Sequence, residues 1–202
     1  MSWLDNMIPF LKEQEAKHDQ RGEDVEGKTH SDGSSILTFG YGHRDNGNNI
    51  SSKVSNLTSN EYEAWSDSTL KSDLTNAAKR GRQAFSNRYS GTPHNVQTKN
   101  GTYTTDHSVY DNLTDDAKSI ITDFQFNIGH IKGWPKLMKA LINEDWEKAE
   151  IESIRFLNGK KLGKRNNDTF EKFIEPNLKR NQGTTTFMDG VIDRMFEKDI
   201  FS

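Results

Sequence analysis

The stretch "ILTFGYGH" at residues 36–43 decides how the first part of the chain is interpreted. Large apolar and aromatic residues alternate there with smaller ones, and this period of two predicts a short strand. Gly40 and Gly42 interrupt the pattern. Glycine weakens a strand and usually marks a tight bend or a close approach of the backbone to another group. We therefore expect a short strand that ends in a sharp turn.

An amphipathic helix is predicted upstream of the strand, over residues 3–16, because apolar residues recur there at helical spacing as far as Leu11. Glu15 lies four residues beyond Leu11, so it is expected on the apolar stripe of this helix rather than on its wet face. Residues 17–31 are polar and contain glycine, and they predict a loop between the helix and the strand.

Beyond the strand, the pattern becomes mainly helical. Thr58 and Glu61 form a capping box that opens a helix ending near Arg82. Thr114, followed by two aspartates, opens a second long helix that ends near Gly129. Further helices are expected at residues 135–143, 145–157, 167–175 and 187–201.

Residues 84–110 lack helical periodicity, and Asn100-Gly101 between β-prone residues predicts a hairpin. The surrounding segment is basic: residues 71–110 hold six Lys and Arg against two acids, whereas the whole chain has a net charge of −3. Such a patch can hold an anionic polymer, for example a wall glycan or nucleic acid. A solvated loop face explains the same charges equally well.

The 202-residue chain predicts one α+β domain with two lobes. We expect an N-terminal helix and β lobe over residues 1–57, a helical lobe over 58–178 with a basic hairpin inserted at 84–110, and a helical extension over 179–202. No apolar run approaches the ~20 residues of a membrane span. The chain has no cysteine, which excludes a disulfide scaffold and a thiolate zinc site.

Carboxylates are the candidate catalytic groups. The sequence contains no glycine-rich phosphate loop, no HExxH helix and no GxSxG elbow, and it predicts no metal site and no cofactor. Glycoside hydrolysis needs a protonated acid in an apolar site and an ionised carboxylate in a polar one. Glu15 is the candidate for the first role, although a helix-end carboxylate is its default interpretation. Asp32 lies six residues before Thr38, and a plain turn residue is an equal interpretation of it.

Five segments of the chain resemble phage-type lysozymes, the endolysin muramidases of glycoside hydrolase family twenty-four. In order they are "LKEQEA", "SDGSSILTFGYGH", "LTSNEYEAW", "DFQFNIG" and "DWEKAE". The order matches that family over roughly residues 4–175. Its pattern is a helix ending in Glu-Gly, a hairpin that carries Asp and then Thr, the signature "TxGYGH" and later helices. The "TFGYGH" block with Asp six residues before Thr is the most specific part.

This resemblance implies a lysozyme-like fold, with a small hairpin-bearing N-terminal lobe, a larger helical C-terminal lobe and a cleft between them. It also implies that Glu15 is the general acid, that Asp32 activates water or stabilises oxocarbenium-like charge, and that Thr38 places the water. Four further residues would bind substrate: Tyr41, His43, Asn127 and Arg165. For Asn127, a hydrogen bond inside its helix is an equal alternative.

Two features depart from the family pattern. Ala16 stands where the family has glycine after the catalytic Glu, and sixteen residues rather than eight separate Glu15 from Asp32. Glu23 keeps the family's spacing to Asp32, and Glu26 is followed by glycine, so each is a rival for the acid. Both fall in the predicted polar loop, and the sequence favours Glu15.

The resemblance implies a monomeric peptidoglycan hydrolase that cleaves the β-1,4 bond between N-acetylmuramic acid and N-acetylglucosamine and lyses a bacterial host. The partner is the glycan strand, with no nucleic acid. Such a phage enzyme is made in the host cytoplasm and reaches the wall or periplasm, or it is carried in the virion. The alternatives are a lytic transglycosylase, which forms an anhydro product, and a non-catalytic glycan-binding or virion structural module.

Overall fold

The computed structural model describes residues 2–15, 17–29, 35–45, 49–89, 96–98, 101–103, 107–157 and 160–182. The chain divides into two units, Met1–Asp145 and Trp146–Ser202. This boundary differs from the lobe boundary that we expect after residue 57. Each unit is described below by itself.

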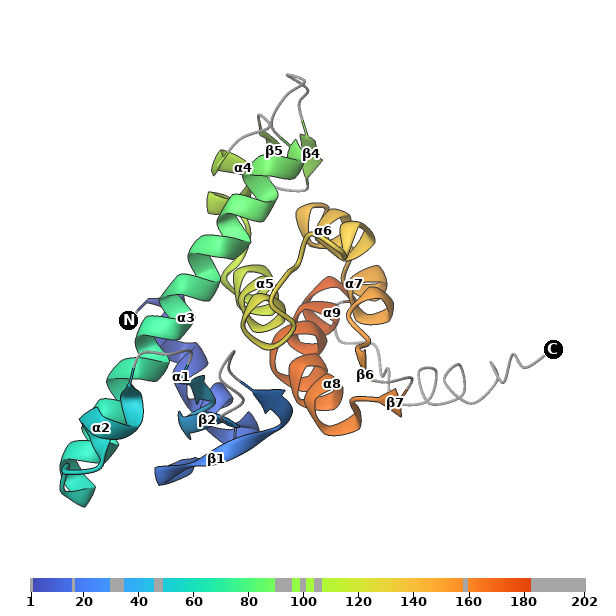
Figure 1. Ribbon diagram of the computed structural model, residues 1–202. Coiled ribbons are helices and arrows are strands. Elements are labelled where there is room, and N and C mark those ends of the chain that lie inside the picture. The colour runs from blue at the N-terminus through green and yellow to red at the C-terminus, as the bar shows by residue number, and fades with distance from the viewer. Residues whose placement is uncertain are drawn as a thin grey trace. The chain divides into compact units, whose positions relative to one another are not determined.

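The first unit contains a small antiparallel sheet, with strand order β1-β2-β3, and most of the long helices (Figure 1). Its elements are α1 (Trp3–Gln14), β1 (His18–Thr29), β2 (Ser35–Gly40), β3 (His43–Arg44), α2 (Ile50–Val54), α3 (Ser59–Tyr89), β4 (Val96–Thr98), β5 (Gly101–Tyr103), α4 (His107–Asp111), α5 (Asp115–Asn127) and α6 (Pro135–Ile142). Helices and a three-stranded antiparallel sheet in one chain fit the α+β class predicted from the sequence.

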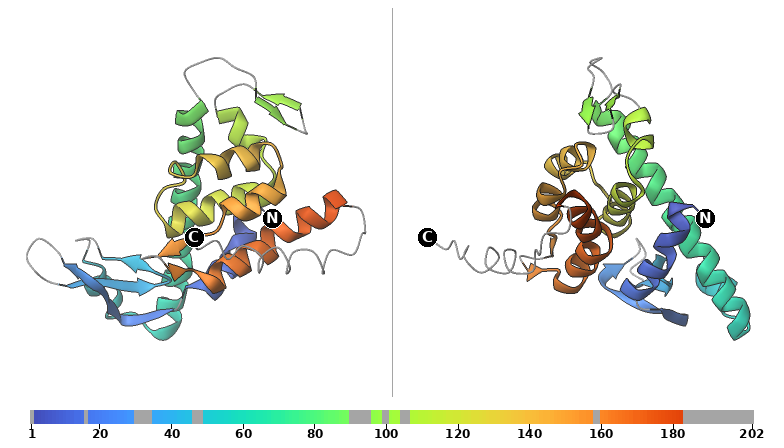
Figure 2. Two further views of the ribbon diagram at one scale, coloured as in Figure 1. Left: turned by 90° about the vertical axis from the view of Figure 1, so that its right-hand side faces the viewer. Right: turned by 180° about the vertical axis from the view of Figure 1, so that it is seen from behind.

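The long helix α3 organises the first unit. It contacts α1, α4, α5, β2 and β3, and α1 also contacts α5; Figure 2 shows α1 and α5 beside it in both views. At the crossing with α5, a Cβ on Gly81 would lie 2.8 Å from Cγ2 of Ile121, so glycine permits this close approach. The apolar side chains of these helices form the core: Met7, Phe10, Leu11, Leu70, Leu74, Phe85, Ile120, Ile121 and Phe124.

The start of α3 is determined by the local sequence, and its end is determined by packing. At the start, the predicted capping box is confirmed: Thr58 N–H and Oγ1 each lie 2.7 Å from Oε2 of Glu61. The helix ends at Tyr89, later than the predicted end near Arg82. Phe85 is fully buried and packs edge-on against Tyr110, 5.9 Å between ring centroids. This tertiary contact holds the last turns of α3 in place.

The predicted loop at residues 17–31 is wrong, because His18–Thr29 forms strand β1 and pairs with β2. The register shifts between His18 and Glu23, and Gly22 in that interval has φ +72°. This is the conformation of a glycine bulge. Polar residues and an internal glycine lower local strand propensity, but pairing with β2 overrides it.

The hairpin predicted within residues 84–110 exists but is shorter. Strands β4 and β5 pair antiparallel, with Thr98 opposite Gly101, so the connecting pair is 99–100 rather than Asn100-Gly101. Residues 84–89 belong to α3, and His107–Asp111 forms α4. The predicted helix that starts after Thr114 is confirmed as α5, whose N-cap Thr114 accepts a hydrogen bond from Ala117 N–H at 3.2 Å.

The second unit contains α7 (Trp146–Glu152), β6 (Phe156–Leu157), β7 (Lys160–Lys161), α8 (Gly163–Thr169), the π-helical turn η1 (Phe170–Ile174) and α9 (Glu175–Gln182). We expect a helix to stop before Pro176, but α9 runs through it. Proline cannot donate a backbone hydrogen bond to the preceding turn. The turn directly before it is the wider π turn η1, in which the hydrogen-bond pattern already differs from that of an α-helix. The helix predicted at residues 187–201 lies outside the described residues. None of the described helices has the length and apolar character to cross a membrane.

Candidate functional site

The turn between β2 and β3 is built on two glycines in the left-handed region. Gly40 has φ +52° and Gly42 has φ +86°, as the sequence pattern predicts for a sharp turn. A Cβ on Gly40 would lie 3.1 Å from Oγ and 3.4 Å from Cα of Ser66 on α3. The strand therefore ends against the backbone of the long helix, and only a residue without a side chain fits there.

Glu15 lies against the second glycine of this turn. Its Oε2 is 3.7 Å from the position that a Cβ on Gly42 would occupy, and no other described atom outside the neighbouring residues lies within 4 Å of that position. The "GYGH" turn begins at Gly40, 25 positions after Glu15 in the chain. The fold brings the turn backbone and the carboxylate together, and the missing side chain leaves space in front of Oε2.

The expected reason for this placement was wrong. Glu15 is not on the apolar stripe of α1, because it is the C-cap residue, with extended backbone at φ −101° and ψ 121°. Its N–H still donates to the carbonyl of the fully buried Leu11 at 2.8 Å, but its side chain is only partly buried. The direction of the carboxyl group is set by the exit of the chain from the helix rather than by helical phase.

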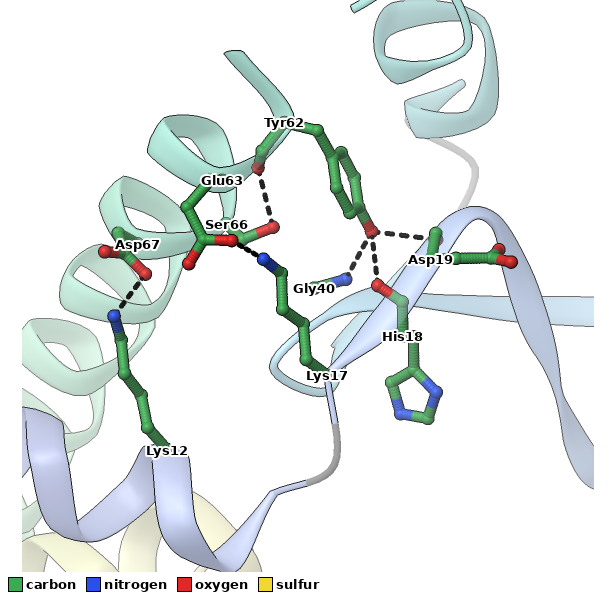
Figure 3. Close-up of polar contacts among 9 residues, drawn as sticks. All are labelled: Lys12, Lys17, His18, Asp19, Gly40, Tyr62, Glu63, Ser66 and Asp67. Carbon is green, nitrogen blue, oxygen red and sulfur yellow. Dashed lines mark hydrogen bonds and ion pairs between the residues drawn. The ribbon is translucent and has the colours of Figure 1, made fainter. Parts of the chain in front are cut away.

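Tyr62 on α3 fixes the strands that precede and form the turn (Figure 3). Its hydroxyl accepts a hydrogen bond from Gly40 N–H at 2.8 Å and lies 2.8 Å from the carbonyl oxygens of His18 and Asp19, to which it donates. Burial raises the pKa of the Tyr62 phenol, so it stays neutral and can keep both roles. One side chain thus joins α3, β1 and β2 next to the turn.

Two lysines tie the segment around Glu15 to the same helix (Figure 3). Lys12 on α1 pairs with Asp67 at 2.6 Å, and Lys17 pairs with Glu63. The Asp67 carboxylate raises the pKa of Lys12, which keeps its charge. The Nζ atom of Lys12 also lies 5.3 Å from the ring centroid of Tyr41, within reach of a cation–π interaction. Lys12 therefore links α1, α3 and the turn.

His43, at the far side of the turn, is held by α3. Its Nδ1 lies 2.6 Å from Oδ2 of Asp73, and its ring meets Trp65 edge-on at 6.2 Å between centroids. The Asp73 hydrogen bond raises the pKa of His43 against the opposing effect of burial. This environment makes His43 a structural anchor of the turn, and its predicted contact with substrate stays a prediction.

Thr38 is on β2, two residues before Gly40, and the residue is 8% exposed. It points to the opposite face of the sheet from its neighbour Phe39, which packs with Ile50, Val54 and Tyr62. In the strand register, Thr38 lies opposite Glu23, one of the two rivals for the acid. Asp32 lies outside the described residues, as do the side chains of Glu23 and Glu26.

The remaining predicted residues belong to two other helices. Asn127 is the exposed last residue of α5, and its contact with substrate and the alternative of a hydrogen bond inside the helix both stay predictions. Arg165 belongs to α8 in the second unit, where its carbonyl accepts from the guanidinium of Arg155 at 3.3 Å. Its predicted role in binding substrate stays a prediction.

The residues that support the candidate site carry no signal in the sequence that identifies them. Tyr62, Asp67 and Asp73 recur along one helix, but nothing in their spacing marks the partners that they contact. The same holds for Arg155, which is fully buried in the second unit and donates to Oγ1 of Thr169 at 2.6 Å. A buried arginine is identified only from tertiary structure, since its sequence neighbours are ordinary.

Within the described residues, no group of three or more His, Asp and Glu side chains is arranged to hold a metal ion. Comparison of the chain with protein-family models, curated proteins and solved structures gave no match.

Proposed function

We propose that this protein is a peptidoglycan hydrolase that cleaves the β-1,4 bond between N-acetylmuramic acid and N-acetylglucosamine. The observation that supports the proposal is the approach of the Glu15 carboxylate to Gly42 in the "TFGYGH" turn, with Oε2 3.7 Å from the Cβ position. An acid next to a side-chain-free turn can reach a bulky polymer without steric interference. General acid catalysis of glycosidic cleavage needs such access.

In the proposed reaction, Glu15 protonates the glycosidic oxygen as the bond to the anomeric carbon breaks. Water adds to that carbon and gives its proton to the Asp32 carboxylate, and the product has a free reducing end. Solvent then takes the proton from Asp32 and reprotonates Glu15. Thr38 and Asp32 would position the water and stabilise the positive charge that develops on the sugar ring. The described groups around the turn have a fixed arrangement, since Tyr62, Lys12 and Asp73 each tie a part of it to α3.

The proposal includes a lysozyme-like arrangement of the chain and a role in lysis of a bacterial host by a phage. It is supported by the order of elements in the first unit: a helix that ends at the acid, an antiparallel hairpin with the glycine turn, and a long capped helix behind it. The proposed place of action is the cell wall, reached from the host cytoplasm or from a virion.

Digestion of purified peptidoglycan sacculi with the full-length protein, followed by mass spectrometry of the released fragments, tests this proposal. The expected products are muropeptides with reducing N-acetylmuramic acid ends. Fragments ending in 1,6-anhydro-N-acetylmuramic acid would assign a lytic transglycosylase instead. Intact sacculi after prolonged incubation, with the protein bound to them, would indicate a non-catalytic binding module.

A further inference from the structure

The two halves of α3 have opposite charges. Residues 59–73 contain four acids and one lysine, whereas residues 74–89 contain four Lys and Arg and no acid. The acids of the first half are all engaged: Glu61 with Thr58, Glu63 with Lys17, Asp67 with Lys12 and Asp73 with His43. The first half of the helix therefore supports the candidate site. The second half has a different chemistry.

One stripe of the second half faces solvent along several turns. At 3.6 residues per turn, positions i, i+4, i+7, i+8, i+11 and i+15 share one face of a helix. On α3 these are six exposed residues without any acid or aromatic ring, which we call the amide–cation face: Ser72, Asn76, Lys79, Arg80, Gln83 and Asn87. It extends over roughly 22 Å at 1.5 Å per residue. The buried face of the same turns packs on α4 and α5.

The two cations of this face have no internal role. Within the described residues, no carboxylate pairs with Lys79 or Arg80, while the neighbouring Arg82 pairs with Asp111 at 2.6 Å. Gln83 and Asn87 hydrogen-bond to each other at 2.6 Å, which orders the amides along the stripe. A row of hydrogen-bonding amides around two unneutralised cations is suited to a long ligand with both neutral polar groups and negative charges.

We infer that the amide–cation face binds the peptidoglycan strand outside the cleavage site, through the carboxylates of the strand and its N-acetylated sugars. This inference rests on the proposed function. Single-stranded nucleic acid fits the face less well, because such sites stack bases on aromatic side chains and none is exposed on it. A duplex polyphosphate would need more than two cations to compensate its charge density. Amides beside cations instead match a strand whose sugars carry acetamido groups and whose stem peptides carry carboxylates.

The test compares two variants with the same change in net charge. Lys79→Gln/Arg80→Gln removes both cations of the face, and Lys53→Gln/Lys132→Gln removes two exposed cations elsewhere on the first unit. Each pair is placed in the Glu15→Gln background, and binding to purified sacculi is measured by sedimentation at low and high salt. Thermal midpoints and circular dichroism report whether each variant remains folded.

The face variant should bind sacculi roughly three- to tenfold more weakly than the parent at low salt, since two exposed charge contacts are lost. Its binding should also depend less steeply on salt than that of the parent. The control variant should match the parent in both respects. Equal weakening by both variants, or none by either, would overturn the inference. Tighter binding of a duplex DNA fragment than of sacculi, lost in the face variant, would assign the face to nucleic acid and overturn it as well.

Failure of the inference and failure of the proposed function give different results. If sacculi bind through the face but the wild-type protein releases no fragments, the inference holds and the hydrolase proposal fails. If wild-type protein releases fragments and the face variant binds like the parent, the hydrolase proposal holds and the inference fails.

Discussion

Oε2 of Glu15 lies 3.7 Å from the position that a Cβ would occupy on Gly42, so the end of α1 and the glycine turn after β2 lie together. Two parts of the chain that are distant in sequence thereby come together. The glycine serves two purposes, because its φ of +86° strains any other residue and because its missing side chain leaves the carboxylate accessible.

Substitution by alanine should lower the free energy of unfolding more at Gly40 than at Gly129. Gly40 and Gly129 both have positive φ, but a Cβ on Gly40 meets Ser66 at 3.1 Å, whereas nothing lies within 4 Å of a Cβ on Gly129. Gly129→Ala should lose about 1–2 kcal/mol of unfolding free energy from backbone strain alone. Gly40→Ala should lose about 1–3 kcal/mol more from overpacking. Urea denaturation measures both losses of unfolding free energy. Equal losses would show that Ser66 moves aside without a cost in stability.

The pair of His43 and Asp73 should make stability depend on pH. The folded pKa of His43 is raised by Asp73, so the stabilisation is fully present below the ordinary histidine value of about 6.5 and is lost as the pH rises through the raised folded value. Asp73→Asn should therefore cost about 1 kcal/mol near pH ~5.5 and much less near pH ~9. NMR titration should show a lower His43 pKa in the variant.

A double-mutant cycle provides the control for this pair. In a His43→Gln background, Asp73→Asn should cost the same at both pH values, because no imidazolium remains to interact with the carboxylate. A pH-dependent loss that persists without His43 would assign the effect to another titrating group.

Thr38 should act through its hydroxyl rather than through packing. Thr38→Ser keeps the hydroxyl, and Thr38→Val replaces it with a methyl group of similar size in a position that is 8% exposed. If the hydroxyl places the attacking water, the valine variant should lose roughly tenfold or more in kcat while the serine variant stays within a few-fold. Asp32→Asn should resemble the valine variant. Sacculus turbidity gives the rates, and wild-type rates in the valine and Asn variants would remove both residues from the mechanism.

The sequence predicted the elements that local chemistry determines. The Thr58–Glu61 capping box, the Thr114 N-cap and the strand ending at Gly40 are each encoded within a few residues, and all three are found. Strand β1 was missed because it depends on pairing with β2, and the extension of α3 to Tyr89 was missed because it depends on the contact between Phe85 and Tyr110.

The candidate site shows the same distinction. The motif identified Glu15 and the glycines, but helical phase gave the wrong reason for the position of Glu15, since α1 ends one residue before it. The supports from α3 could not be predicted, because Tyr62, Asp67 and Asp73 find their partners only when distant segments come together.

Three glutamine variants, compared on sacculi, show whether Glu15 is the catalytic acid. Glutamine keeps the shape of glutamate and removes the transferable proton. Glu15→Gln should lose ~10²–10⁴-fold in rate, because proton transfer contributes about that factor. Its thermal midpoint should be held or raised. Glu23→Gln and Glu26→Gln should stay within a few-fold of wild type. A nearly active Glu15→Gln variant, together with an inactive Glu23→Gln or Glu26→Gln variant, would contradict the account.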